Sequence, residues 1–89
     1  MNKVYVFGKI VYKSKLKYII SPKLKVYMEL IIQEASEYEF SCVVNEDVLK
    51  KIKDGIRKVD EATYVYIMGE ARLENNMLYI IVKDVYIFS

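Results

Sequence analysis

Residues 25–44 read KVYMELIIQEASEYEFSCVV and hold the clearest structural pattern in this 89-residue chain. Over 25–34, apolar and polar side chains alternate with a period of two, which is typical of a half-buried β-strand. Residues 36–37 predict a polar turn, and a second alternating run follows over 38–44. The stretch therefore predicts an antiparallel hairpin with one buried face. The side chains expected on that face are Val26, Met28, Leu30, Ile32, Phe40, Cys42 and Val44.

Runs outside this hairpin predict three more strands, over residues 4–12, 64–73 and 77–88. They are rich in the β-branched and aromatic residues that strands favour. Gly8 interrupts the first run, which indicates a bulge or a bend. The Glu74-Asn75-Asn76 segment predicts a short turn between the last two strands, because asparagine tolerates positive φ.

The last strand is expected to change its buried face partway along. Leu78, Ile80 and Val82 alternate toward the core in its first half. After Lys83-Asp84 the apolar positions shift parity, to Val85 and Ile87. A parity change within one strand predicts a β-bulge at that point.

One helix is expected between the third and fourth strands. Asn45 can cap its first turn, and the acidic residues 46–47 suit the positive end of the helix dipole. Strand, strand, strand, helix, strand, strand is the element order of an OB-fold barrel. The sequence thus predicts an all-β domain over residues 1–89, a five-stranded OB barrel with this helix at one end. The expected apolar stripe of the helix is Leu49, Ile52, Ile56 and Val59.

The composition argues against catalysis. There is no histidine and only one cysteine, which removes the usual nucleophile pairs, zinc sites and disulfides. Cys42 lies on the predicted core face and is expected to be a small buried hydrophobe. We expect a protein that is not an enzyme, holds no metal or cofactor, does not enter a membrane and is cytoplasmic.

Charge is distributed unevenly along the chain. The first 28 residues contain seven lysines and no acidic residue, although the net charge of the whole chain is only +2. Such asymmetry suggests a polyanionic partner. The alternative is that these lysines only pair with carboxylates on neighbouring strands.

Aromatic side chains interleave with these lysines, as single-stranded nucleic acid binding requires. Tyr27 lies on the wetter face of its strand and Tyr18 lies between lysines, so both are candidates for stacking on bases. Tyr12 shares the parity of the core residues Val6 and Ile10, so we expect it in the core. The predicted nucleic-acid-binding residues are Lys9, Lys13, Lys15, Lys17, Tyr18, Lys23, Lys25 and Tyr27.

A second apolar set faces away from the predicted core in the last two strands. A small monomer rarely exposes such a patch, and tyrosine and methionine are enriched at protein interfaces. We interpret the set as an oligomer interface, with base stacking and cover by other parts of the chain as alternatives. Its members are Tyr64, Tyr66, Met68, Met77, Tyr79 and Ile81.

Residues 2–10, NKVYVFGKI, resemble the first strand of bacterial single-stranded DNA-binding proteins, and residues 64–73 resemble their fourth strand. Residues 17–30 are similar to the first hairpin of the small primosomal replication protein of the same superfamily. The resemblance implies an OB fold that binds single-stranded DNA. The chain has no tryptophan, so tyrosine would have to stack on the bases. The last strand runs almost to Ser89, so a compact variant without an acid-tipped tail is expected.

These observations predict a non-catalytic protein that binds single-stranded nucleic acid with little sequence preference. DNA is the preferred ligand and RNA the second choice, and a homodimer or higher homo-oligomer is expected. The competing hypothesis is an OB-fold module that binds protein and no nucleic acid. Lysines and tyrosines that converge in one groove would favour the first hypothesis, and lysines scattered around the barrel would favour the second.

Overall fold

The computed structural model describes residues 3–20, 22–52 and 63–88, and within these ranges there are six strands and one short helix. No helix in this part of the chain is long and apolar enough to cross a bilayer. In chain order the elements are β1 (Lys3–Lys13), β2 (Lys17–Ile19), β3 (Lys25–Gln33), β4 (Glu39–Asn45), α1 (Glu46–Lys51), β5 (Tyr64–Glu74) and β6 (Met77–Phe88).

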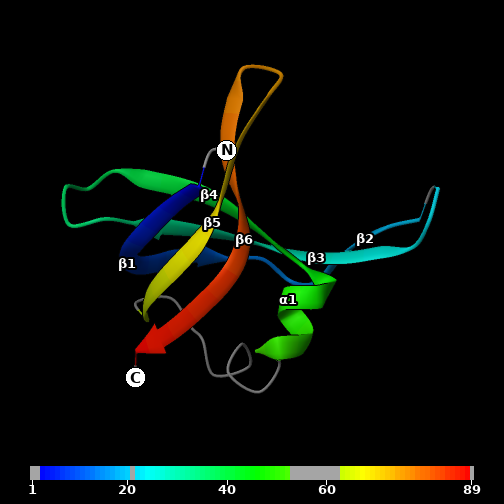
Figure 1. Cartoon of the computed structure of the whole chain (residues 1–89), viewed down its shortest axis with the longest axis horizontal. Helices are drawn as coiled ribbons and strands as arrows, with labels where there is room; N and C mark the ends of the chain where they lie inside the picture. The colour runs from blue at the N-terminus through cyan, green and yellow to red at the C-terminus, as the bar shows by residue number, and fades with distance from the viewer. Residues whose placement is uncertain (1–2, 21, 53–62, 89) are drawn as a thin grey trace.

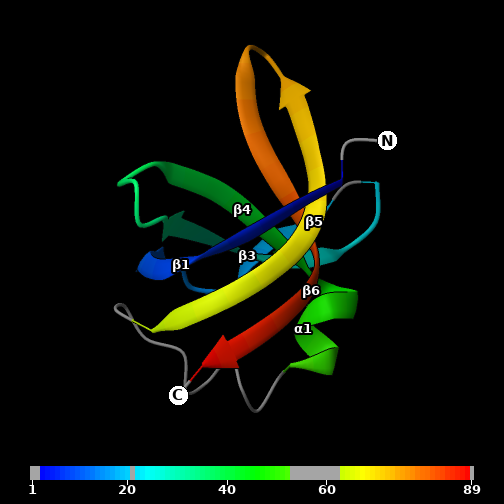
Figure 2. The same cartoon turned by 60° about the vertical axis from the view of Figure 1, so that its left-hand side comes forward.

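The strands of the described residues close into a mixed five-stranded barrel, which confirms the predicted OB fold (Figures 1 and 2). The sheet order is β1-β5-β6-β4-β3-β2, and β1 also pairs with β3. The first half of β1 pairs with β5 and its last residues with β3, so this strand closes the barrel. The β4–β6 pair is parallel and the other pairs are antiparallel.

Two hairpins extend beyond the barrel (Figure 1). One is the β5–β6 hairpin, whose turn residues Asn75 and Asn76 both have positive φ, as predicted. The other, which we call the arm, consists of β2, the start of β3 and the described residues between them, 20 and 22–24. The sequence did not predict β2, a three-residue strand that pairs only with β3 within the described chain.

The core is built from alternating residues of every barrel strand, as the period of two predicted. Burial raises the pKa of the Cys42 thiol to about 12, so this cysteine is a small buried hydrophobe. The buried hydrophobic side chains are Val6, Ile10, Met28, Leu30, Ile32, Cys42, Val44, Val48, Leu49, Val65, Ile67, Ile80 and Val82.

Two core predictions are wrong, and Val26, also predicted in the core, is half-buried outside the core cluster. Leu78 is 60% exposed, because β6 begins in the protruding hairpin, where no barrel interior lies beneath it. Tyr12 is 42% exposed. The register of β1 against β3 shifts between Ile10 and Tyr12, so Val11 is an extra residue that turns Tyr12 to the outer face.

The parity change in β6 is a bulge, as predicted: Met68 pairs with Asp84 whereas Gly69 pairs with Val82. Of the two alternatives predicted at Gly8, a bulge or a bend, the bulge is excluded, because Gly8 pairs in register with Val65.

Both of these glycines are needed for close packing of neighbouring strands. A Cβ on Gly8 would collide with the Gln33 carbonyl and lie 2.8 Å from Ile32 Cγ2. A Cβ on Gly69 would collide with the Ile81 carbonyl and lie 2.7 Å from Ile80 Cγ2.

Helix α1 packs against the core at one end of the barrel through Val48 and Leu49, and Ile52 lies partly buried beside them. Asn45 occupies the N-cap position but its side chain makes no capping hydrogen bond, contrary to the prediction. The remaining predicted stripe residues, Ile56 and Val59, lie outside the described residues.

Candidate nucleic-acid interface

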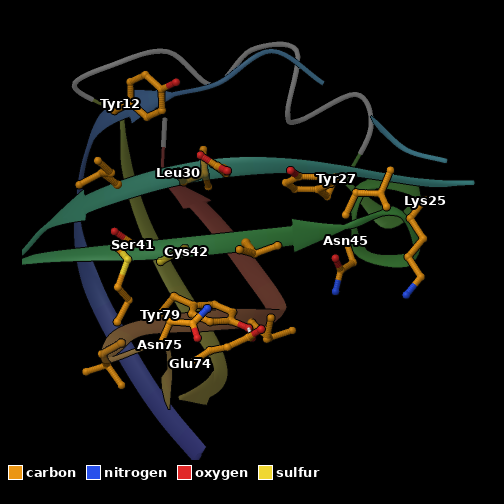
Figure 3. Close-up of a pocket in the computed structure, with 17 residues that line it drawn as sticks. Tyr12, Lys25, Tyr27, Leu30, Ser41, Cys42, Asn45, Glu74, Asn75 and Tyr79 are labelled. Atoms are coloured by element: carbon orange, nitrogen blue, oxygen red, sulfur yellow. Dashed lines mark hydrogen bonds between the residues drawn. The ribbon is translucent and has the colours of Figure 1, made fainter. Parts of the chain in front are cut away.

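An open groove of about 560 Å³ crosses the outer face of β3, β4 and the first half of β6 (Figure 3). Its floor comes from side chains that alternate with the core, so each strand supplies both the barrel interior and the groove. The register places Val43 of β4 beside both Glu29 of β3 and Ile81 of β6. The floor residues are Tyr27, Glu29, Ile31, Ser41, Val43, Asn45, Tyr79 and Ile81.

The two protruding hairpins flank this groove. Ile19 and Lys25 line it from the arm, and Glu74, Asn75 and Met77 line it from the β5–β6 hairpin. OB folds bind oligonucleotides at this location, on the strands that correspond to β3 and β4 and on the loops beside them. The groove thus joins a largely apolar floor to flanking walls that carry charge of both signs.

Tyr12, Tyr27 and Tyr79 all line the groove, from three different strands (Figure 3). Tyr12 reaches it because the bulge at Val11 places it beside Ile31 on the outer face. Sequence reasoning assigned Tyr12 to the core and Tyr79 to an oligomer interface, and only Tyr27 to the binding site.

A hydrogen bond fixes the position of Tyr79. Its hydroxyl donates to Glu74 Oε2 at 2.7 Å. This bond raises the pKa of Tyr79, because it favours the neutral phenol next to a carboxylate. The ring of Tyr79 is thereby held on the groove floor, with its hydroxyl at the hairpin wall.

Lys17 and Lys25 are the predicted lysines at the groove. Lys25 lines it, and Lys17 pairs opposite Tyr27 on the same face of the arm. The Lys17 ammonium lies 3.2 Å from Glu29 Oε1, and the hydrogen bond to that carboxylate raises the pKa of Lys17. One predicted cross-strand ion pair therefore exists.

The other predicted basic residues do not line the groove, a scatter that by itself favours the competing protein-binding hypothesis. Lys15 and Lys23 are exposed in the segments that lead into and through the arm. Lys13 pairs opposite Leu30, on the face of β1 away from Tyr12. Lys9 pairs opposite Tyr64, on a different face of the barrel.

Tyr18 and Tyr27 do not share a surface. Tyr18 pairs opposite Val26, whereas Tyr27 pairs opposite Lys17, so the two rings project from opposite faces of the arm. Tyr18 is 61% exposed but does not line the groove. The structure thus brings Tyr27 together with Tyr12 and Tyr79 and separates it from Tyr18.

The predicted interface set is divided between two surfaces. Met77, Tyr79 and Ile81 line the groove. Tyr64, Tyr66 and Met68 lie instead on the outer face of β1, β5 and the second half of β6, which we call the aromatic face. Exposed rings that the sequence analysis did not assign join them there: Tyr5, Phe7, Tyr86 and Phe88.

Ring contacts tie the aromatic face together. The Phe7 ring centroid lies 5.8 Å from that of Tyr64 and 5.5 Å from that of Phe88. Tyr5 and Tyr66 are 6.2 Å apart. The sequence contains a pattern that could have predicted the positions of the four unassigned rings. They alternate with core-facing residues such as Val4, Val6 and Val85, which places them on the outer face.

No protein-family model matches the chain, and a search of curated proteins finds no match. Solved structures, in contrast, resemble it over almost its full length. The mitochondrial single-stranded DNA-binding protein Rim1 of S. cerevisiae has a TM-score of 0.73 at 19% identity, over 97% of this chain and 92% of that one.

Two PriB structures are also similar. PriB of Ralstonia solanacearum has a TM-score of 0.69 at 11% identity, over 100% of this chain and 99% of that one. The dimeric N-terminal domain of PriB from Thermoanaerobacter tencongensis has a TM-score of 0.66 at 16% identity, over 99% of this chain and 97% of that one. The chain thus has the OB fold of PriB and of single-stranded DNA-binding proteins, as the resemblance in its strands implied.

Proposed function

We propose that this protein binds single-stranded nucleic acid, with DNA preferred over RNA, and has no catalytic activity. The observation that carries the proposal is that Tyr12, Tyr27 and Tyr79 all line one open groove at the ligand-binding face of an OB fold. The similar Rim1 structure belongs to a protein named for single-stranded DNA binding, which supports the same conclusion.

The chemistry of the groove suits unpaired bases. Tyrosine rings and an apolar floor offer stacking surfaces, and each stacked base contributes roughly 1–3 kcal/mol whatever its identity. Lys25 lines the groove from the arm, Lys23 is exposed in the arm and Lys15 is exposed just before it, so these lysines supply positive charge for phosphates. Binding is therefore expected to depend on salt and to tolerate most sequences.

The first test is fluorescence anisotropy with labelled dT and mixed-sequence 20-mers at several salt concentrations. If three to five phosphates are neutralised, log K should fall with log salt with a slope of about −2 to −3.5. Lys25→Ala should weaken binding to both oligonucleotides alike and make the slope shallower by about 0.7. Lys50→Ala is the matched control, because Lys50 pairs with Glu46 on α1 and does not line the groove.

Absence of binding at low salt, where phosphate contacts are strongest, would contradict the proposal. The competing hypothesis, an OB-fold module that binds protein, would then stand. It draws on the carboxylates of Glu29 and Glu74, which lie in the groove beside the lysines.

We also propose that the aromatic face packs against a second copy of the chain. Its exposed rings contact one another and form a surface of the kind that soluble monomers rarely leave in water. Two such sheet faces can pack about 10 Å apart with interdigitated side chains. One similar structure, the N-terminal domain of PriB from Thermoanaerobacter tencongensis, is dimeric.

Light scattering after gel filtration is expected to give a mass of two chains or more for the wild type. Tyr66→Lys places a charge within the aromatic face and should reduce the mass to that of one chain. Tyr18→Lys is the control, because Tyr18 is also an exposed tyrosine but lies on the arm. A wild type that remains monomeric at high concentration would overturn this part of the proposal.

A further inference from the structure

A carboxylate lies in the floor of the groove, where phosphates would be repelled. Glu29 is on the outer face of β3 between Tyr27 and Ile31, and it lines the groove with them. If the site only attracted a polyanion, a negative charge here would weaken it. A carboxylate at this position is more readily explained if Glu29 contacts the bases of the nucleic acid and not its phosphates.

Both backbone polar groups of Glu29, the N–H and the carbonyl, form hydrogen bonds with Ser14. The Glu29 N–H donates to Ser14 Oγ at 2.8 Å, and the Ser14 N–H donates to the Glu29 carbonyl at 2.9 Å. Ser14 is itself buried, and its hydroxyl donates to the Lys15 carbonyl. The strand that carries the carboxylate is thus fixed at this residue.

The side chain of Glu29 is oriented as well. Its Oε1 lies 3.2 Å from the Lys17 ammonium, which comes from the arm. A carboxylate has two oxygens with several lone pairs, so this ion pair leaves the group able to accept further hydrogen bonds. Lys17 also offsets part of the charge, which reduces the repulsion of nearby phosphates.

The spacing of residues along β3 places the Glu29 carboxylate beside the position where a base would stack on Tyr27. Residues two apart on a strand share a face and are about 7 Å apart. Glu29 is therefore next to Tyr27, and it lies between Tyr27 and the Ile31 position, where Tyr12 pairs. For Glu29 to contact such a base, the base stacked on Tyr27 has to turn its edge toward the carboxylate.

We propose that Glu29 reads this edge and makes the groove prefer cytosine over thymine at the nucleotide that stacks on Tyr27. At position 4 of the ring, cytosine offers an amino donor and thymine a carbonyl acceptor, and a glutamate carboxylate can only accept. The N3–H donor of thymine lies one ring position away, so the preference requires that the carboxylate faces position 4. The inference rests on the proposed function and adds a modest base preference to it.

The test compares the affinities of dC and dT 20-mers at pH 8, by anisotropy, for wild type and Glu29→Gln. The wild type should bind dC about fivefold more tightly than dT, which corresponds to one net hydrogen bond. A glutamine amide can donate to O4 as well as accept from N4, so Glu29→Gln should bring the ratio close to one. Glu39→Gln is the control, since it removes one charge from β4 at a position that does not line the groove.

The outcomes separate the two ideas. Equal wild-type affinities for dC and dT would overturn the base preference and leave nucleic-acid binding intact. The base preference would also be overturned if Glu29→Gln strengthened the binding of dC and of dT by the same factor. The carboxylate would then act only by repelling phosphates. Failure to bind either oligonucleotide would overturn the proposed function, and this inference with it.

Discussion

Gly69→Ala is expected to destabilise the barrel by about 3 kcal/mol or more, the upper end of the cost of overpacking a well-packed core. The added methyl group would meet the backbone carbonyl of Ile81 and lie 2.7 Å from Ile80 Cγ2. Neither is the free end of a flexible side chain, so β5 and β6 would have to separate. In a domain of this size the midpoint of thermal unfolding should fall by at least about 12 °C.

Thermal unfolding followed by circular dichroism measures this effect. Arg72→Ala is a matched control on the same strand, because Arg72 is exposed and its replacement should stay within about 0.5 kcal/mol of wild type. Gly8→Ala should behave like Gly69→Ala, since its methyl group would meet the Gln33 carbonyl. A Gly69→Ala protein that melts at the temperature of wild type would show that this close approach is not needed.

Tyr27→Ala is expected to weaken binding of single-stranded DNA by roughly 5- to 150-fold, the equivalent of about 1–3 kcal/mol for one stacked base. The phenol ring, not its hydroxyl, supplies the stacking surface, so Tyr27→Phe should bind nearly as tightly as wild type. Anisotropy at fixed salt with a dT 20-mer gives both values. Equal losses for the two variants would contradict stacking at Tyr27.

Tyr18→Ala is the control for this experiment. Tyr18 is more exposed than Tyr27 and lies in the same arm, but it projects from the opposite face. Its loss should therefore change affinity little. If Tyr18→Ala weakens binding as much as Tyr27→Ala, the nucleic acid follows a path other than the groove.

The fold could be predicted where the alternation of apolar and polar residues within one strand is clear. The β3–β4 hairpin alternates cleanly, and its core residues, such as Leu30 and Cys42, are buried as expected. The bulge in β6 could also be predicted, because the polar pair Lys83-Asp84 interrupts the apolar pattern. In both places the signal is local to the strand.

The candidate site was harder to predict because it depends on pairing between strands. Val11 and Tyr12 are both compatible with a core strand, and only the change of partner of β1 from β5 to β3 reveals the bulge between them. The separation of Tyr18 from Tyr27 likewise follows from the β2–β3 register. No pattern within a single strand contains that information.

The two close glycines and the alternating core set bear on how sequences of this shape can diverge. The interior requires apolar side chains at every second strand position and no side chain at Gly8 and Gly69. Many sequences meet these requirements. The requirements do not apply to the two protruding hairpins, which can therefore differ in length and charge. The same barrel is therefore compatible with the 11% to 19% identity between this chain and three solved structures of this fold, and the hairpins can carry different residues without any repacking of the interior.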